Sequence, residues 1–106
     1  MKNFIFIEND WKTPNTYGEN FAYPQNQSGV YLLVERLIKD KHIEFKILYV
    51  GSSKNLYQRY KSHEVLRVLK ETYGDVAFYF RYFKKFKEIE KKLIKIIQPR
   101  FNKQCL

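Results

Sequence analysis

The stretch GVYLLVERLIKDKHIEFKILYVG, residues 29–51, decides the fold, because it contains two apolar runs joined by a short polar one. Residues 29–37 and 43–51 are rich in β-branched, aromatic and other apolar side chains, which favour β-strands. Residues 38–42 between them include Lys, Asp and His and are short enough to form a turn. The stretch therefore predicts an antiparallel hairpin.

The register of this hairpin determines which side chains share a face of the sheet. If the turn centres on Asp40, Tyr31 lies opposite Tyr49. The same register places Gly29 opposite Gly51. Side chains alternate between the two faces of a strand, so a slip of one residue would turn the two tyrosines to opposite faces. We therefore expect both tyrosine rings on one face.

Helical segments are predicted after the hairpin and near the end of the chain. Ser52 or Ser53 can cap a helix that runs to about residue 69, because a hydroxyl can accept from the unpaired N–H groups of the first turn. We expect this helix to break near Ser62 into two short helices. A last helix over residues 85–97 ends because Pro99 cannot continue it.

A third strand and one domain complete the predicted fold. Residues 76–83, VAFYFRYF, have the aromatic and β-branched content of a strand. We therefore expect an α+β domain over residues 28–106, with a three-stranded, mainly antiparallel sheet flanked by helices. Residues 1–27 are irregular and rich in Pro, Asn and aromatic side chains, so we expect a short strand at 4–7 and then a segment packed on the domain.

The charge of the chain points to a polyanionic partner. Its formal net charge is +9, from 20 basic and 11 acidic residues, which favours nucleic acid. No amphipathic helix with a bulky apolar face favours a membrane surface, and no run approaches the roughly 20 apolar residues of a membrane span. Cys105 is the single cysteine, which excludes an intrachain disulfide. We expect a cytoplasmic protein that does not bind membranes.

Glu90 stands out because it lies within an apolar stripe of the last predicted helix. The stripe consists of Phe86, Ile89, Leu93, Ile94, Ile96 and Ile97. Glu88, in contrast, lies among the lysines of the opposite side. Moving a carboxylate out of water is costly unless it is paired or binds a metal. Glu90 is therefore either half of a buried ion pair or a metal-binding or catalytic carboxylate.

Arg59 and His63 form a second candidate pair. Their spacing of four residues projects them from one helical face, together with Leu56 and Tyr60. An arginine at such a position can bind a phosphate with its fork of donors, and a histidine can pass a proton near neutral pH. Taken singly, Arg59 also fits a solvated face, and His63 fits a semi-buried structural histidine.

The ordered set of these residues resembles the GIY-YIG nuclease family. GVY at residues 29–31 and YVG at residues 49–51 match its two tripeptides, with valine in place of isoleucine in both. Arg59 follows eight residues after Gly51, and Glu90 precedes Asn102 by twelve residues. The resemblance covers most of the chain and implies a small antiparallel sheet flanked by helices.

The resemblance also implies roles for the matched residues. Glu90 would be the only protein ligand of one Mg²⁺ or Mn²⁺ ion, and Arg59 would stabilise the charged phosphate. Tyr31 would be the general base for water, with His63 accepting its proton. Tyr49 would orient water or phosphate, and it remains the alternative base. A tyrosine pKa is ordinarily near 10, so the base would need nearby cations or a hydrogen bond to His63.

Supporting roles follow for the remaining matched residues. Gly29 and Gly51 would let the strands and the phosphate approach closely, and Asn102 would fix the site through hydrogen bonds. Nucleic-acid contacts are expected from Lys54, Arg59 and Arg100.

Two features depart from the family pattern. About seventeen residues separate the two tripeptides, which implies a longer hairpin with its tip away from the site. Some members have a lysine directly after the second glycine, where this chain has Ser52, and Lys54 is a candidate substitute.

The sequence thus predicts a metal-dependent DNA endonuclease. A catalytically silent nucleic-acid-binding module and a nuclease subunit of a larger repair or restriction complex are the alternatives. The choice between a homodimer and a larger complex stays open. So do the kind of DNA target and the choice between nicking and double-strand cleavage.

Overall fold

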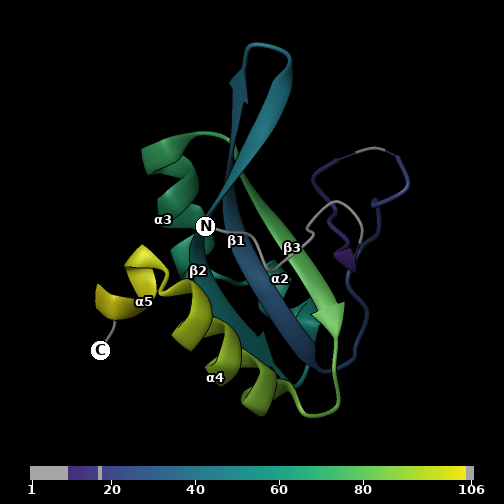
Figure 1. Ribbon diagram of the computed structural model, residues 1–106. Coiled ribbons are helices and arrows are strands. Elements are labelled where there is room, and N and C mark those ends of the chain that lie inside the picture. The colour runs from purple at the N-terminus through teal and green to yellow at the C-terminus, as the bar shows by residue number, and fades with distance from the viewer. Residues whose placement is uncertain (1–9, 17, 105–106) are drawn as a thin grey trace.

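The computed structural model describes residues 10–16 and 18–104 and shows a three-stranded antiparallel sheet flanked by helices (Figure 1). The sheet has the order β2-β1-β3 and consists of β1 (Gly29–Lys39), β2 (His42–Ser53) and β3 (Val76–Tyr82). The helices are α2 (Leu56–Lys61), α3 (Glu64–Tyr73), α4 (Phe86–Ile97) and α5 (Arg100–Gln104). The predicted α+β class and the predicted sheet are confirmed. The strand predicted at residues 4–7 lies outside the described residues.

The turn of the β1–β2 hairpin is tighter than predicted. Lys39 pairs with His42, so the loop consists of two residues, and Asp40 adopts a left-handed conformation with φ of 53°. The pairing shifts again at a bulge between Leu33 and Val34. A bulge adds one residue to one strand and changes the register beyond it. The tip of this long hairpin projects beyond the rest of the molecule (Figure 1).

The turn and the bulge together correct the predicted register by two residues. Tyr31 pairs with Gly51 and not with Tyr49. Gly29 pairs with Ser53 and not with Gly51. Because the shift is an even number of residues, the rings of Tyr31 and Tyr49 still lie on one face, with centroids 6.2 Å apart.

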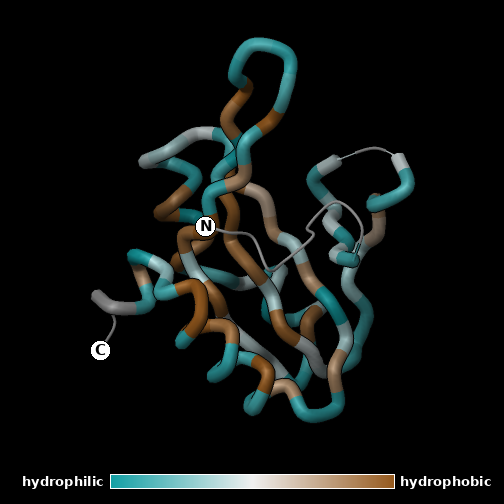
Figure 2. The backbone as a smooth tube through the Cα atoms, viewed as in Figure 1, coloured by the Kyte–Doolittle hydropathy of each residue, from teal (hydrophilic) through white to brown (hydrophobic). Residues whose placement is uncertain are grey.

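The two faces of the sheet bury separate apolar clusters, as alternation of side chains along the strands requires. The face toward α2 and α3 buries Tyr31, Leu33, Leu48, Phe78 and Phe80, among others. The face toward α4 buries Val30, Leu32, Val34, Val50 and Tyr79, among others. Figure 2 shows apolar residues concentrated on the strands and polar residues along the outer side of α4. Strand β1 is central, and its residues 29–34 are buried on both faces.

The helices after the hairpin break as predicted, but their caps differ from the prediction. Ser52 and Ser53 belong to β2, and Asn55 caps α2 by accepting from the backbone N–H of Gln58 at 3.1 Å. The predicted break near Ser62 is confirmed, since α2 ends at Lys61 and α3 begins at Glu64. An asparagine side chain is as effective an N-cap as serine, so either residue type was compatible with this position.

Helix α4 packs an apolar side on the sheet, but the predicted stripe is too wide by one residue. Phe86, Ile89, Leu93, Ile94 and Ile97 are half-buried. Ile96 is 54% exposed and therefore lies outside the contact. The helix ends at Ile97, and its C-cap residue Gln98 adopts a left-handed conformation directly before Pro99. No helix in the described part of the chain is long and apolar enough to cross a membrane.

The segment before β1 packs along the free edge of β3. The backbone N–H of Lys12 donates to the carbonyl of Phe80 at 3.0 Å, and the N–H of Phe80 donates back at 2.8 Å. Trp11 is buried and contacts the ring of Phe83, with centroids 6.4 Å apart. Backbone pairing of this kind satisfies groups that an edge strand otherwise exposes.

Candidate active site

Tyr31 is the centre of the candidate site. Its side chain is 2% exposed, and its ring stacks on Phe78 with centroids 5.0 Å apart and planes 15° apart. The ring lies directly over Gly51, where the Cβ of any other residue would overlap it. The absence of a side chain at Gly51 therefore allows the ring to occupy this position, and packing on both sides fixes the hydroxyl.

His63 contacts the hydroxyl of Tyr31 from the start of α3. Its Nε2 lies 2.7 Å from the tyrosine oxygen, and the histidine side chain is 6% exposed. Its Nδ1 accepts the backbone N–H of Leu66 at 3.2 Å and so caps α3. A neutral imidazole has one donor and one acceptor nitrogen. Because Nδ1 accepts, the proton is on Nε2, and His63 donates to Tyr31.

The direction of this hydrogen bond does not fit the proton-accepting role that the resemblance implies for His63. To accept a proton from Tyr31 directly, Nε2 would have to be unprotonated, which in a neutral ring places the proton on Nδ1. Nδ1 could then no longer accept from Leu66, and α3 would lose its cap. In the structure, His63 is therefore a donor that holds the tyrosine oxygen in place.

Arg59 provides a second donor to the same oxygen. Its Nε lies 3.4 Å from the Tyr31 hydroxyl, a long hydrogen bond, and its side chain is half-buried on α2. With Arg59 and His63 both donating, the proton of the tyrosine hydroxyl points to a third partner. The site therefore presents an O–H group whose acceptors are already engaged and whose proton is available to a bound molecule.

Burial shifts the pKa of both Tyr31 and His63. It raises the pKa of Tyr31 to about 12, and the charges of Tyr49 and Glu90 act in the same direction, while the hydrogen bond and the charge of Arg59 oppose them. Burial, with the nearby charge of Arg59, lowers the pKa of His63 to about 4. Both side chains are therefore neutral near pH 7, which agrees with the assigned direction of their hydrogen bond.

Tyr49 closes one side of this group. Its ring centroid lies 6.2 Å from that of Tyr31 and 6.0 Å from that of His63, where it meets the imidazole edge-on. Unlike Tyr31, it is half-buried. Such tilted and stacked contacts stabilise aromatic groups against each other. The structure thus brings together Tyr31, Tyr49, Arg59 and His63, all predicted from the sequence.

Glu90 approaches from α4, on the other side of β2. Its carboxylate is half-buried, and Oε1 accepts from the Oγ of Ser52 at 2.5 Å. No basic side chain of the described residues forms an ion pair with Glu90, which leaves the ion-pair alternative without support. The sequence predicts Ser52 as a possible helix cap and as the position of a missing lysine, and not as a partner of Glu90. Its place directly after Gly51 is a signal that could have indicated contact with the site.

The features of Glu90 fit a site for one hard cation. One carboxylate oxygen accepts from Ser52, and the other accepts no hydrogen bond within the described residues. Mg²⁺ commonly retains several waters and uses one or two protein carboxylates. The described residues contain no group of three or more His, Cys, Asp or Glu arranged to hold a metal, so any ion here would be held chiefly by Glu90.

Asn102 forms two hydrogen bonds with the backbone of β2 beside the site. Its Oδ1 accepts the backbone N–H of Val50 at 2.7 Å, and its Nδ2 donates to the carbonyl of Val50 at 2.8 Å. Both groups are buried. This pair ties the segment after Pro99 to the strand that bears Tyr49 and Gly51. Asn102 is therefore connected to the site through the strand, and its role in supporting the site stays a prediction.

The other predicted residues lie outside this group. At Gly29 a Cβ would meet the backbone of Arg81 and the side chain of Leu56, so this glycine permits close packing of β1 against β3 and α2. Lys54 and Arg100 are exposed, and neither forms a hydrogen bond or ion pair within the described part of the chain. The guanidinium of Arg100 lies 5.6 Å from the ring centre of Phe101.

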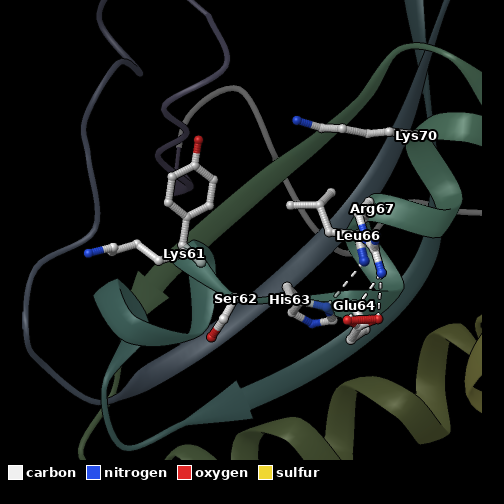
Figure 3. Close-up of a pocket in the computed structure, with 8 residues that line it drawn as sticks. Lys61, Ser62, His63, Glu64, Leu66, Arg67 and Lys70 are labelled. Carbon is white, nitrogen blue, oxygen red and sulfur yellow. Dashed lines mark hydrogen bonds and ion pairs between the residues drawn. The ribbon is translucent and has the colours of Figure 1, made fainter.

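An open pocket of about 340 Å³ lies beside His63, between α2 and α3 (Figure 3). Its lining residues are Tyr60, Lys61, Ser62, His63, Glu64, Leu66, Arg67 and Lys70. Arg67 donates to Glu64 at 2.8 Å, whereas Lys61 and Lys70 extend away from that pair (Figure 3). The pocket thus gives the otherwise buried histidine a partly basic surrounding.

Comparisons of the chain with protein-family models, curated proteins and solved structures return no match. Any functional interpretation must therefore come from the geometry of the chain itself. That geometry places one tyrosine hydroxyl, one arginine and one carboxylate around the end of β2.

Proposed function

We propose that the chain is a metal-dependent DNA endonuclease that hydrolyses phosphodiester bonds at the site around Tyr31. The observation that carries this proposal is the convergence of Arg59 and His63 on the Tyr31 hydroxyl, with the Glu90 carboxylate held nearby by Ser52. A phosphodiester hydrolase needs a proton acceptor for water, positive charge for the phosphate, and support for the leaving oxygen. The first two requirements have candidates in this group.

Tyr31 is the proposed acceptor of the water proton. At rest it is protonated, because burial raises its pKa to about 12. Hydrogen bonds to the oxygen favour the phenolate, and Arg59 and His63 already donate to that oxygen. A divalent cation bound at Glu90 would supply positive charge close to the phosphate and to Tyr31, which favours both the phenolate and the charged transition state.

The reaction balances with water as the only co-reactant. The Tyr31 hydroxyl first releases its proton to solvent. Water then gives one proton to the resulting phenolate, and its oxygen forms a bond to phosphorus. The bond between phosphorus and the leaving sugar oxygen breaks, and that oxygen takes a proton from solvent. Arg59 binds the phosphate oxygens during this exchange, because a guanidinium presents several donors in a fixed plane.

The test is cleavage of plasmid, duplex, flap and four-way DNA in Mg²⁺ or Mn²⁺, with Glu90→Ala as the inactive comparison and Glu90→Gln as an isosteric control. We expect nicked or linear products from the unaltered chain only. The proposal fails if the unaltered chain gives no more product than Glu90→Ala on every DNA form.

The net charge of +9 also supports a second candidate, a nucleic-acid-binding module that does not cleave. Such a module would bind duplex DNA with an affinity whose logarithm falls with the logarithm of salt, by roughly 0.9 per neutralised phosphate. It would give no metal-dependent products. Binding and cleavage measured on the same DNA therefore separate the two candidates.

For cleavage of both strands, one site per chain requires either two copies or two successive nicks. We therefore include a homodimer, or a nuclease subunit within a larger DNA repair or restriction complex, in the proposal. We place the protein in the cytoplasm, with DNA as its partner and no membrane. Sedimentation of the protein with and without DNA measures the number of copies.

A further inference from the structure

A group of exposed aromatic side chains lies away from the candidate active site. We call it the aromatic surface, and it consists of the exposed Phe21, Tyr23 and Tyr82 together with the half-buried Tyr57. Phe21 is 39% exposed, Tyr23 58% and Tyr82 38%. The rings of Phe21 and Tyr23 meet edge-on with centroids 5.4 Å apart. Exposed aromatic rings gathered in one place commonly mark a binding surface.

Hydrogen bonds of the Gln25 backbone hold together the segments that contain Tyr23, Tyr57 and Tyr82. The N–H of Gln25 donates to the hydroxyl of Tyr82 at 2.9 Å. The carbonyl of Gln25 accepts from the backbone N–H of Tyr57 at 3.2 Å. Tyr23 is two residues before Gln25. These contacts place the end of β3, the start of α2 and the segment before β1 at one surface.

Packing of the segment before β1 on the domain does not explain why these rings are exposed. A ring that attached the segment would be buried, as Trp11 of the same segment is, with 4% exposure. Tyr23, in contrast, keeps more than half of its surface in solvent. The hydroxyl of Tyr82 is bound by Gln25, so the ring of Tyr82 is held in place while it stays exposed.

The charge around the aromatic surface is positive. The ammonium of Lys61 lies 5.0 Å from the ring centre of Tyr57. The four aromatic residues belong to the segments 20–34, 45–63 and 76–87, which contain no Asp or Glu, while Glu19 lies two residues before Phe21. The second and third segments each contain four lysines or arginines. Rings beside cations suit a ligand that combines flat bases with negative charge.

Helix α2 separates the aromatic surface from the candidate active site. Successive residues of a helix are about 100° apart around its axis. Tyr57 and Arg59 therefore point to different sides, and Arg59 contacts Tyr31. Lys61 is one turn after Tyr57 and lines the pocket beside His63. A strand that lies on the aromatic surface could therefore continue past α2 to the site.

We propose that the aromatic surface binds single-stranded nucleic acid by stacking of its bases on Tyr23, Phe21 and Tyr82. The inference rests on the proposed nuclease function and narrows its substrate to DNA with an unpaired segment next to the cleaved phosphate. Stacking on aromatic side chains accepts any base, so binding is expected to depend little on sequence. A fully paired duplex hides the faces of its bases and cannot bind this surface.

The test measures binding without metal, in the Glu90→Ala background, so that cleavage cannot interfere. The probes are an oligothymidylate of about 15 nucleotides and an abasic strand of equal length, with the same phosphates and no bases. We expect the abasic strand to bind about tenfold more weakly or worse, since stacking contributes strongly for each base. A matching uridylate strand shows whether ribose is also accepted.

Variants assign the base-dependent binding to the aromatic surface. In Phe21→Ala/Tyr23→Ala, the preference for the base-bearing strand should fall by about tenfold. Tyr23→Phe keeps the ring and should retain the preference, and so should Ile38→Ala, which removes an exposed apolar side chain at the hairpin tip. Circular dichroism and thermal unfolding check that each variant is folded. Equal binding of the two strands, or a full preference in the folded double variant, overturns the proposal.

Cleavage by the unaltered chain separates this proposal from the proposed nuclease function. If base-dependent binding occurs and no DNA is cleaved, the nuclease proposal fails while the stacking surface stands as a binding site. If fully paired duplex is cleaved and base-dependent binding is absent, the nuclease stands and the stacking surface fails. We expect both to hold, with faster cleavage of a duplex that has a single-stranded arm.

Discussion

The imidazole of His63 forms hydrogen bonds with both β1 and α3. Its Nε2 lies 2.7 Å from the Tyr31 hydroxyl, and its Nδ1 caps α3. One ring therefore couples the start of a helix to the centre of the candidate site. A residue with this double role can affect activity through Tyr31 and stability through α3. Suitable substitutions separate the two effects.

Substitution of His63 by asparagine should preserve the cap and lose the contact with Tyr31. Asparagine is a favoured N-cap residue, but its side chain is too short to replace both ring nitrogens. We expect His63→Ala to be less stable than His63→Asn by about 1 kcal/mol, the usual contribution of a cap. Both variants should lose cleavage to a similar extent.

Urea unfolding measures the first difference, and initial rates of plasmid nicking measure the second. If His63→Ala and His63→Asn unfold at the same urea concentration, Nδ1 does not contribute as a cap. If His63→Asn retains the full nicking rate, the bond to Tyr31 is not needed for the reaction.

The stability of the chain should fall as the solution becomes acidic. Burial lowers the pKa of His63 from 6.5 to about 4, so the unfolded state takes up a proton at higher pH than the folded state does. The stabilisation is therefore complete above pH 6.5 and is lost as the pH falls from there to about 4. The difference between the two pKa values corresponds to a loss of up to about 3 kcal/mol.

Urea unfolding across this pH range tests the linkage, with His63→Asn as the matched variant that has no titrating group at this position. We expect a smaller loss of stability on acidification in the variant. Parallel curves for the two proteins would show that other groups cause the acid sensitivity. At the alkaline end, the raised pKa of Tyr31 predicts a further loss as the pH rises from 10 to about 12.

Gly51 should tolerate no side chain while Tyr31 occupies its present position. A Cβ at residue 51 would overlap the tyrosine ring, and the ring is held from the other side by Phe78. We expect Gly51→Ala to destabilise the fold by about 1–3 kcal/mol, as overpacking does elsewhere. Replacing Tyr31 by a smaller residue should remove much of that cost.

A double-mutant cycle with Gly51→Ala and Tyr31→Val, followed by urea unfolding, measures this coupling. Gly18→Ala is a useful comparison, because a Cβ there meets nothing within 4 Å although its φ of 121° adds strain of its own. Additive effects of the two substitutions at residues 51 and 31 would contradict a direct clash.

The elements of the fold could be predicted from the sequence, but their exact pairing could not. The apolar runs of β1, β2 and β3 have lengths and compositions that strands require, and Pro99 marks the end of α4. The register, in contrast, depends on a two-residue turn and on a bulge at Leu33–Val34. A bulge reflects packing between strands, so no local sequence signal indicates its position.

For the site, residue types were predictable and hydrogen-bond directions were not. The spacing of Arg59 and His63 predicted one shared helical face, which is wrong, because α2 ends at Lys61 and His63 caps α3. Both side chains nevertheless contact Tyr31. The proton on Nε2 follows only from the cap that Nδ1 provides, and this cap depends on the break between α2 and α3. The contact between Ser52 and Glu90 joins residues 38 positions apart and therefore requires the tertiary structure.

Ser52 should determine how well Glu90 holds a cation. Its Oγ donates to Oε1 at 2.5 Å and so restricts the orientation of the carboxylate. Groups that orient a metal ligand typically contribute tenfold to a hundredfold to metal affinity or activity. We therefore expect Ser52→Ala to require about tenfold more Mg²⁺ for half-maximal cleavage. Ser52→Thr retains the hydroxyl and should need much the same concentration as the unaltered chain.

Titration of Mn²⁺ followed by electron paramagnetic resonance gives a second measurement that does not depend on cleavage. Ser52→Ala should bind Mn²⁺ more weakly than Ser52→Thr, and Glu90→Ala should not bind it at this site. If Ser52→Ala binds Mn²⁺ as tightly as the unaltered chain, the hydroxyl does not orient the ligand. If Glu90→Ala also binds it equally, the cation is held elsewhere, and the carboxylate on α4 has a different role.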